Sequence, residues 1–252
     1  MEKYYLCDYS NPKDIELYAK ALVNMTFKEV LSKYGDSSIS EVYKKRQYKG
    51  GLGNLVQEEF FGIKANSLSE PDFKVAGVEL KVSPYEEKKD KTLRAGERLV
   101  LTMISFSGPI ENDFYQSHLW IKCRLLLLIY YLRDKAQPSN LDYQIKYVSL
   151  FTPPEEDLSV IERDYRIITE KISGGKAHEL SESDTLYLGA CTKGVNAEKS
   201  LIKQYYSVDT EAKKRAFCYK NSYMTFVLNK YIINGIETYE PIVKDSKLLK
   251  EK

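Results

Sequence analysis

The sequence predicts an α/β protein in which helices flank a mixed β-sheet. Apolar residues recur at helical spacing in residues 14–34 and 153–173, whereas residues 72–106 contain stretches that alternate between apolar and polar side chains. Two further apolar runs, 125–132 and 143–151, are rich in strand-forming residues, as is typical of strands buried on both faces. With 252 residues, the chain can bury one large core or two lobes that share a cleft.

The predicted helices differ in how clearly they are bounded. The clearest one follows Pro153-Pro154, has acidic residues in its first turn, and ends at Gly174-Gly175. The spacing in residues 14–34 predicts one long amphipathic helix that ends at Gly35. We expect shorter helices at residues 38–45, 54–61 and 222–233.

The predicted strands lie on both sides of a charged segment. Residues 78–82 alternate apolar and charged side chains, and residues 99–106 are rich in strand formers. Between them, residues 85–98 contain EEKKDK and predict a charged, mobile connection. A short strand at 186–191 leads into a polar loop at 192–197, and the Lys-rich end KDSKLLKEK is expected to be frayed.

The charges are nearly balanced, with 38 Lys and Arg against 36 Asp and Glu, so a net charge of +2 gives no overall attraction to nucleic acid or membrane. Any site for a polyanion must therefore be a local patch. The four cysteines are far apart and only two histidines accompany them, which argues against a zinc site or a disulfide framework. We expect reduced thiols in a cytoplasmic protein without a membrane span or signal peptide.

The stretch SEPDFKVAGVELK, residues 69–81, places two carboxylates and a lysine in a predicted hairpin. Glu79 and Lys81 are two residues apart, so a strand projects both side chains to one face. Asp72 precedes them across a turn that Gly77 permits. Because an acidic residue two positions before a basic one arises by chance on the order of five times in such a chain, a solvated strand face remains an alternative on spacing alone.

The pattern P-D-(x)n-E-x-K is typical of metal-dependent nucleases. Hydrolysis of a phosphodiester requires neutralised charge on the phosphoryl oxygens and a deprotonated water in line with the leaving 3′ oxygen. Two converging carboxylates repel each other unless a hard cation lies between them, and Mg²⁺ prefers such oxygen ligands. Lys81 can orient the attacking water or stabilise the developing charge.

Several segments, taken in order, resemble one family. SEPDFKVAGVELKVSPY resembles the active-site segment of the MutH family, which comprises a mismatch-repair nicking endonuclease and the Sau-type restriction endonucleases that share its DNA sequence, GATC. Four later segments resemble the restriction-enzyme branch, and the similarity covers residues from about 50 to 231. These segments are GERLVLTMISF, GGKAHELSE, LGACTKGVNA and KKRAFCYKNSYMT.

The resemblance implies a restriction-endonuclease-like fold with two lobes around a DNA cleft. We expect a single MutH-like endonuclease domain over 1–252, with a catalytic lobe at about 1–110 and a mixed, DNA-reading lobe at 111–252. The implied function is that of a type II restriction endonuclease, or its catalytic domain, which hydrolyses double-stranded DNA at GATC with Mg²⁺ and leaves a 5′-phosphate. A mismatch-repair nicking endonuclease and a catalytically weak GATC-binding module are the alternatives. A companion DNA methyltransferase and a C-terminal domain absent from this chain are further expected partners.

The resemblance also assigns residues to the catalytic site. Asp72 and Glu79 become the metal ligands and Lys81 the water-positioning lysine. The family has a glutamate on the preceding helix; counting forward from Gly53 gives Gln57, whereas counting back from Gly62 gives Glu58, which we choose because an amide supplies no charge. Lys122 matches a second lysine near the scissile phosphate, with a solvated strand-edge lysine as the alternative. His118, a lone histidine, is expected to be structural.

Base reading is expected from a loop and a basic cluster. Lys193 aligns with the family's base-contacting loop, and Gly194 would let the backbone approach a base edge. The cluster of basic and aromatic residues after it suits phosphate contacts, although a solvated helix end is the alternative. The family's base-contacting tyrosine has no clear match, since Cys218 takes its position beside Tyr219. The cluster comprises Lys213, Lys214, Arg215 and Lys220, interleaved with Phe217, Tyr219 and Tyr223.

Overall fold

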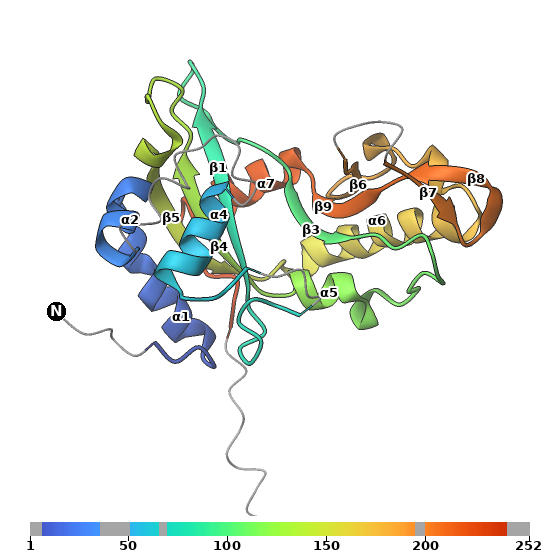
Figure 1. Ribbon diagram of the computed structural model, residues 1–252, viewed down its shortest axis with the longest axis horizontal. Coiled ribbons are helices and arrows are strands. Elements are labelled where there is room, and N and C mark those ends of the chain that lie inside the picture. The colour runs from blue at the N-terminus through green and yellow to red at the C-terminus, as the bar shows by residue number, and fades with distance from the viewer. Residues whose placement is uncertain (1–6, 36–50, 66–69, 195–199, 241–252) are drawn as a thin grey trace, which may run out of the picture.

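The computed structural model describes residues 7–35, 51–65, 70–194 and 200–240. Four strands form its central sheet, namely β1 (Glu79–Glu87), β2 (Leu93–Ala95), β4 (Leu126–Leu132) and β5 (Gln144–Phe151). They lie in the order β2-β1-β4-β5, with β1 and β4 parallel and the two outer pairs antiparallel. The sheet is therefore mixed and flanked by helices, as the sequence predicts (Figure 1).

A second, antiparallel sheet lies beside the first (Figure 1). Its strands are β3 (Leu99–Met103), β6 (Leu188–Thr192) and β9 (Arg215–Tyr219), in the order β3-β9-β6. A hairpin of β7 (Leu201–Gln204) and β8 (Ser207–Lys213) extends from this sheet, away from β1 and β4 (Figure 1). Because β3 pairs with β9, and β4 and β5 join β1, a boundary near residue 110 does not separate the two sheets.

The longest helix, α6 (Glu155–Ser173), packs against the three-stranded sheet through its apolar face and confirms the predicted helix there. The remaining α-helices are α1 (Pro12–Ala19), α2 (Phe27–Tyr34), α4 (Gly51–Leu55), α5 (His118–Cys123) and α7 (Asn221–Val227). Single π-helical turns, Val56–Phe60 and Leu228–Ile232, continue α4 and α7. Short 3₁₀ turns lie at Lys20–Leu22, Phe114–Gln116, Asn140–Asp142, Ala177–Glu179 and Glu182–Asp184.

Strand β4 separates two hydrophobic cores. Leu126, Leu128 and Tyr130 enter the larger core, which also holds α6, α7 and the three-stranded sheet. Leu127 and Ile129 point the other way and pack with α1, α2 and α4. All five side chains are 0% exposed. The uninterrupted apolar run in the sequence thus reflects a strand that is buried on both faces.

The prediction of one long helix over residues 14–34 is wrong. The chain breaks after α1, where Asn24 adopts a left-handed backbone with φ 69°. Thr26 then caps α2, since its side chain accepts a hydrogen bond from Glu29 N–H while the Glu29 carboxylate accepts one from Thr26 N–H. This reciprocal capping box stabilises a new helix start inside an otherwise continuous apolar pattern.

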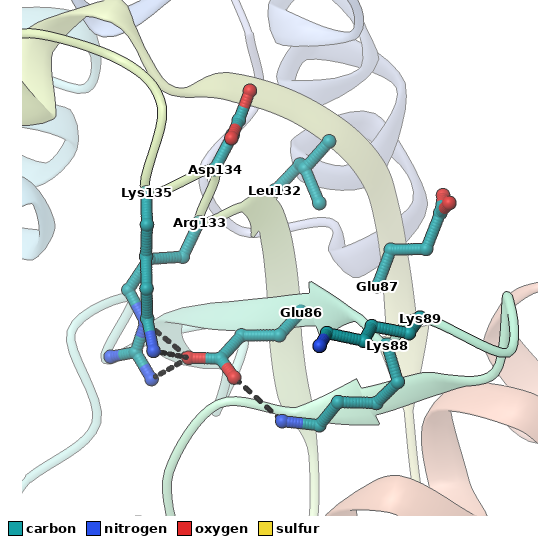
Figure 2. A pocket seen from close by; sticks show the side chains of 8 residues that line it. All are labelled: Glu86, Glu87, Lys88, Lys89, Leu132, Arg133, Asp134 and Lys135. Carbon is teal, nitrogen blue, oxygen red and sulfur yellow. Dashed lines mark hydrogen bonds and ion pairs between the residues drawn. The ribbon is translucent and has the colours of Figure 1, made fainter.

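The charged segment 85–98 is not a loose connection. β1 continues to Glu87 and pairs antiparallel with β2. Figure 2 shows the Glu86 carboxylate among the cationic groups of Lys88, Arg133 and Lys135, which lie in the segments that follow β1 and β4. It accepts hydrogen bonds from Lys88 Nζ at 2.8 Å and Arg133 Nη2 at 2.7 Å.

Two predictions lie outside the described residues, namely the helix at residues 38–45 and the frayed Lys-rich end. The four cysteines are unpaired thiols, as expected, and three of them are buried. Among the helices that the structure describes, none is long and apolar enough to cross a membrane.

Candidate active site

The hairpin before β1 brings Asp72 and Glu79 together. Phe73 and Val78 pair across its turn, and Gly77 closes the turn with φ 67°. This left-handed backbone favours glycine, and a Cβ atom there would also displace the Arg124 guanidinium, which lies 2.7 Å from its position. The two acidic residues flank this bridge and therefore meet at the base of the hairpin.

Backbone hydrogen bonds hold the two acidic side chains in place. Asp72 N–H donates to Glu79 Oε2 at 3.3 Å, and Leu80 N–H donates to Asp72 Oδ2 at 3.0 Å. Each acidic residue is thus tied to the backbone beside the other. The arrangement of Asp72, Glu79 and Lys81 at the start of β1 agrees with the expected P-D-(x)n-E-x-K geometry.

Two lysines neutralise Glu79, which is only 4% exposed. Lys81 Nζ lies 2.8 Å from Glu79 Oε1, and Lys122 Nζ lies 2.9 Å from Glu79 Oε2. Lys122 also donates to the carbonyl oxygen of Glu70 at 2.6 Å. It lies on α5 rather than on a strand edge, because Ser117 caps that helix through Trp120 N–H. The structure therefore brings Lys122 into the cluster, whereas the alternative of a solvated strand-edge lysine is wrong.

The electrostatics of this cluster fit a cation site. Burial, together with the neighbouring charge of Glu79, raises the pKa of Asp72, while the Leu80 N–H, Lys81 and Lys122 oppose that shift. Within the described parts of the chain, no three His, Cys, Asp or Glu side chains are grouped closely enough to hold a metal ion by themselves. A cation here would therefore be held by the Asp72 and Glu79 carboxylates together with neutral oxygens or water, as Mg²⁺ commonly is.

The helix before the hairpin ends in a π-helical turn that contains both Gln57 and Glu58. In Val56–Phe60 the N–H of Phe61 donates to the Val56 carbonyl, five residues earlier, at 3.1 Å. Such a turn adds one residue to a helix and shifts the positions after it. The turn lies between Gly53 and Gly62, the two glycines from which the helix position was counted.

Gln57 is the helix residue that contacts the hairpin. Its Nε2 donates to Asp72 Oδ1 at 2.8 Å. The Glu58 carboxylate instead accepts a hydrogen bond from Ala65 N–H at 3.2 Å, at the end of its own helix. The structure thus corrects the choice of Glu58 for the helix position of the site. The sequence signal for Gln57 was the forward count from Gly53.

Glu79 and its two lysines open into a cleft of about 640 Å³ between the two sheets. Glu79, Lys81 and Lys122 line one side, and the end of β3 lines the other. His118, one helical turn before Lys122, also lines the cleft, and its N–H donates to Glu111 Oε2 at 2.9 Å. The cleft therefore gives a substrate access to both carboxylate-bound lysines.

Arg215 and Tyr219 are not placed for DNA contacts. Tyr219 is 0% exposed, and Arg215 is 8% exposed. The Arg215 guanidinium donates to the carbonyls of Ala190, at 2.6 Å, and Leu180, and burial lowers its pKa. Both side chains belong to the core face of β9, because odd-numbered residues of this strand point inward. The structure corrects both assignments.

The other residues of the basic cluster have different surroundings. Lys220 Nζ donates to the carbonyls of Glu182, at 2.7 Å, and Thr185, at 2.6 Å, so this lysine stabilises the chain leading to β6. Phe217 and Tyr223 are buried, whereas Lys213 and Lys214 are exposed. The exposed pair thus retains the character of a phosphate-contacting patch.

The proposed base-contacting loop is described in part. Lys193 N–H donates to the Lys214 carbonyl at 2.8 Å, which anchors the start of the loop beside the exposed lysines. Gly194 has φ 122°, and a Cβ atom there would lie 2.8 Å from Ser200 Cβ. The chain itself therefore requires a glycine at this position. Residues 195–199, which complete the loop, lie outside the described residues.

A mixed sheet with two carboxylates and a lysine at the start of β1, opening into a cleft beside a second sheet, defines a restriction-endonuclease-like protein with a nuclease-type site. Comparison with known proteins agrees. Residues 61–164 match the family model of the DNA mismatch repair enzyme MutH. The chain is 30% identical over 190 residues to the DNA mismatch repair protein MutH of Shewanella woodyi, covering 74% of this chain and 78% of that protein. The chain belongs to the MutH family.

A second relative extends the similarity over most of the chain. The type II restriction enzyme Sau3AI of Staphylococcus aureus is 40% identical over 227 residues, which is 89% of this chain. The match covers 44% of that protein, so the chain spans less than half the length of this relative. The MutH protein of Shewanella baltica is more distant, at 26% identity over 185 residues, or 72% of this chain and 79% of that protein.

Proposed function

We propose that this protein is a type II restriction endonuclease, or the catalytic domain of one, which hydrolyses double-stranded DNA at GATC with Mg²⁺. The cluster of Asp72, Glu79, Lys81 and Lys122 at the cleft carries the proposal, since it combines carboxylates for a cation with cations for a phosphate. The similarity to Sau3AI over 89% of this chain supports the restriction branch.

The residues of the cluster have separate roles in this reaction. Asp72 and Glu79 would hold Mg²⁺, which when bound neutralises phosphoryl charge and lowers the pKa of water. Lys81, 2.8 Å from Glu79, orients the attacking water and offsets developing negative charge. Lys122, anchored by the Glu70 carbonyl, is held where a scissile phosphate would enter the cleft.

The overall reaction is a hydrolysis at phosphorus. The oxygen of water attacks in line with the 3′ oxygen, the bond between phosphorus and that oxygen breaks, and a proton reaches the leaving oxygen. The products carry a 3′ hydroxyl and a 5′ phosphate. Exposed Lys213 and Lys214, together with Lys193, are proposed to contact the duplex, while the GATC assignment itself rests on the family segments.

The test is digestion of a plasmid that contains GATC sites, with Mg²⁺, in methylated and unmethylated forms. We expect linear fragments from the unmethylated plasmid. Asp72→Asn should lower the cleavage rate by about 10²-fold or more, because the charge that holds the cation and supports the transition state is removed. The exposed carboxylate of Asp209 provides the control, and Asp209→Asn should cut at the wild-type rate.

Two results would contradict this proposal. Cleavage by Asp72→Asn at the wild-type rate would remove the catalytic assignment, and cleavage that ignores a changed base pair in GATC would remove the specificity. Sensitivity of the digestion to methylation would support a companion methyltransferase that protects the host sequence.

A mismatch-repair nicking endonuclease is the second candidate, because the Shewanella woodyi MutH protein matches over 78% of its length. The same gel separates the two functions. A nicking enzyme converts supercoiled plasmid to open circles and depends on repair partners for speed, whereas a restriction enzyme yields linear DNA alone. Binding to GATC without either product would instead indicate a DNA-binding module.

A further inference from the structure

Gln57 lies where a glutamate would add a third carboxylate beside Asp72 and Glu79. Its Nε2 is 2.8 Å from Asp72 Oδ1, and the second oxygen of Asp72 accepts the Leu80 N–H at 3.0 Å. Both oxygens of Asp72 therefore have a donor, and the carboxylate is oriented by the protein alone.

A glutamate could not make this contact in the same way. Two ionised carboxylates at hydrogen-bonding distance repel each other unless a cation or a proton lies between them. The amide of Gln57 replaces that repulsion with a charge-assisted hydrogen bond. Asp72 can therefore keep its position before any cation is bound.

The net charge of the cluster also favours glutamine over glutamate at position 57 when no cation is bound. Asp72 and Glu79 contribute two negative charges, and Lys81 and Lys122, which both contact Glu79, contribute two positive charges. Because Gln57 is neutral, these five side chains have a net charge of zero. A glutamate in its place would leave one negative charge in a half-buried site, which favours the folded state only when a cation is present.

We propose that Gln57 is a positioning residue that fixes Asp72 for cation binding without adding a third negative charge, so that the site holds its divalent cation through two carboxylates. The proposal rests on the nuclease function proposed above, but it concerns cation binding and not the DNA sequence. Gln57 lies in the π turn at Val56–Phe60 and contacts Asp72, while its neighbour Glu58 accepts a hydrogen bond from Ala65 N–H.

The test is calorimetric titration of the full chain with Mn²⁺ in the absence of DNA, together with the melting temperature with and without Mn²⁺. Gln57→Glu should bind Mn²⁺ on the order of tenfold more tightly, because a third charged oxygen is added. Without the cation, it should melt about 2 to 4 °C lower than wild type, and Mn²⁺ should reverse this loss.

Gln57→Met tests the positioning hydrogen bond without adding charge. It keeps the length of the side chain but removes the donor to Asp72, so Mn²⁺ binding should weaken by about tenfold, as for other residues that orient metal ligands. A purely structural role would lower the melting temperature equally with and without Mn²⁺, and it would leave the affinity unchanged.

The chain offers a matched control. Gln137 Nε2 donates to Asp134 Oδ2 at 3.3 Å on an exposed loop, so Gln137→Glu makes the same change beside an aspartate in solvent. It should leave Mn²⁺ binding unchanged. Glu58→Gln, which alters charge at the next position of the helix, should also bind Mn²⁺ like wild type.

Wild-type affinity in both Gln57 variants, or a larger loss in Glu58→Gln, would overturn the inference. If Gln57→Glu does not fold, Gln57→Met decides the question. The experiments also distinguish a failure of this inference from a failure of the proposed function. Mn²⁺ affinities that depend on Gln57 in a protein without GATC cleavage would contradict only the nuclease proposal, whereas cleavage with affinities that ignore Gln57 would contradict only this inference.

Discussion

Lys214 and Arg215 are neighbours in the sequence with opposite surroundings. Lys214 is exposed at the junction of β8 and β9, while Arg215 points into the core and donates to the carbonyls of Ala190 and Leu180. A basic run in the sequence therefore combines a solvated cation with a structural one. Only their places relative to β6 and the chain before it distinguish them.

Arg215→Ala should destabilise the protein and not act as the loss of a phosphate contact. The variant leaves two buried carbonyls without donors, so we expect the free energy of unfolding to fall by about 2 to 3 kcal/mol in urea denaturation. At temperatures where the variant is still folded, its affinity for DNA should depend on salt concentration as the wild-type affinity does.

Lys214→Ala is the matched comparison for Arg215→Ala. Its unfolding free energy should stay within about 0.5 kcal/mol of wild type, because its side chain is exposed. If Arg215→Ala instead kept full stability and bound DNA with a weaker salt dependence, Arg215 would be a phosphate contact after all.

At the scale of elements, β1 carries acidic residues with different roles at its two ends. Glu79 at its start contacts two lysines and opens into the cleft. Glu86 near its end joins the β1–β2 hairpin to the chain after β4, because Arg133 donates to the Glu86 carboxylate (Figure 2). Arg133 also donates to the Gly96 carbonyl. The first group suits cation and phosphate chemistry, and the second stabilises an exposed hairpin.

Glu86→Gln should destabilise the protein at neutral pH. Hydrogen bonds from Lys88 and then Arg133 lower the pKa of Glu86 from 4.5 to about 2, so the ionised form stabilises the fold above pH 4.5. This contribution is lost as the pH falls through about 2. Because the cluster borders solvent, we expect a difference of only about 1 kcal/mol at pH 7 in urea denaturation, shrinking toward acid pH.

Glu87 provides the control for Glu86, since it pairs only with exposed Lys91 among the ion pairs of the described residues. Glu87→Gln should change the unfolding free energy by less than about 0.5 kcal/mol, both at pH 7 and at acid pH. A Glu86→Gln variant whose stability matches that of Glu87→Gln would show that the hairpin does not depend on this cluster.

At the scale of the whole molecule, the two cores share one strand. Alternate residues of β4 enter each core, so neither core can lose its packing without disturbing the other. The two sheets are also interleaved along the chain, since β3 precedes β4 but pairs with β9. We therefore expect both cores to unfold together in one transition.

Leu22→Ala tests this cooperativity, because Leu22 is fully buried in the core that packs with α1, α2 and α4. Its cavity should lower the unfolding free energy by about 2 to 5 kcal/mol. The single tryptophan, Trp120, packs against the other core, so its fluorescence and the far-UV circular dichroism should shift to lower urea concentration together. Leu17→Ala, at a 67% exposed position of α1, should leave both curves in place.

Two separate transitions in Leu22→Ala, with the Trp120 signal unchanged, would contradict the shared core. The cleft between the sheets would then separate two cores that unfold independently. One transition would instead show that the folding of the two cores is thermodynamically coupled.

The sequence by itself determined the features that depend on local spacing. Strands β4 and β5 follow from continuous apolar runs, helix α6 from a periodicity of 3.6 residues, and the Asp72, Glu79 and Lys81 segment from a periodicity of two and a nearby glycine turn. All of these signals act within about ten positions. The family segments added the function, because their order along the chain does not depend on packing.

Only the tertiary structure decided which neighbour of a pair faces the site. Gln57 rather than Glu58 contacts Asp72, and this contact becomes visible only once the hairpin is packed against the helix. In the same way, β9 turns Arg215 into the core and leaves Lys214 outside. In both cases adjacent residues have different surroundings, and contacts with segments distant in sequence decide which of the two is buried or bonded.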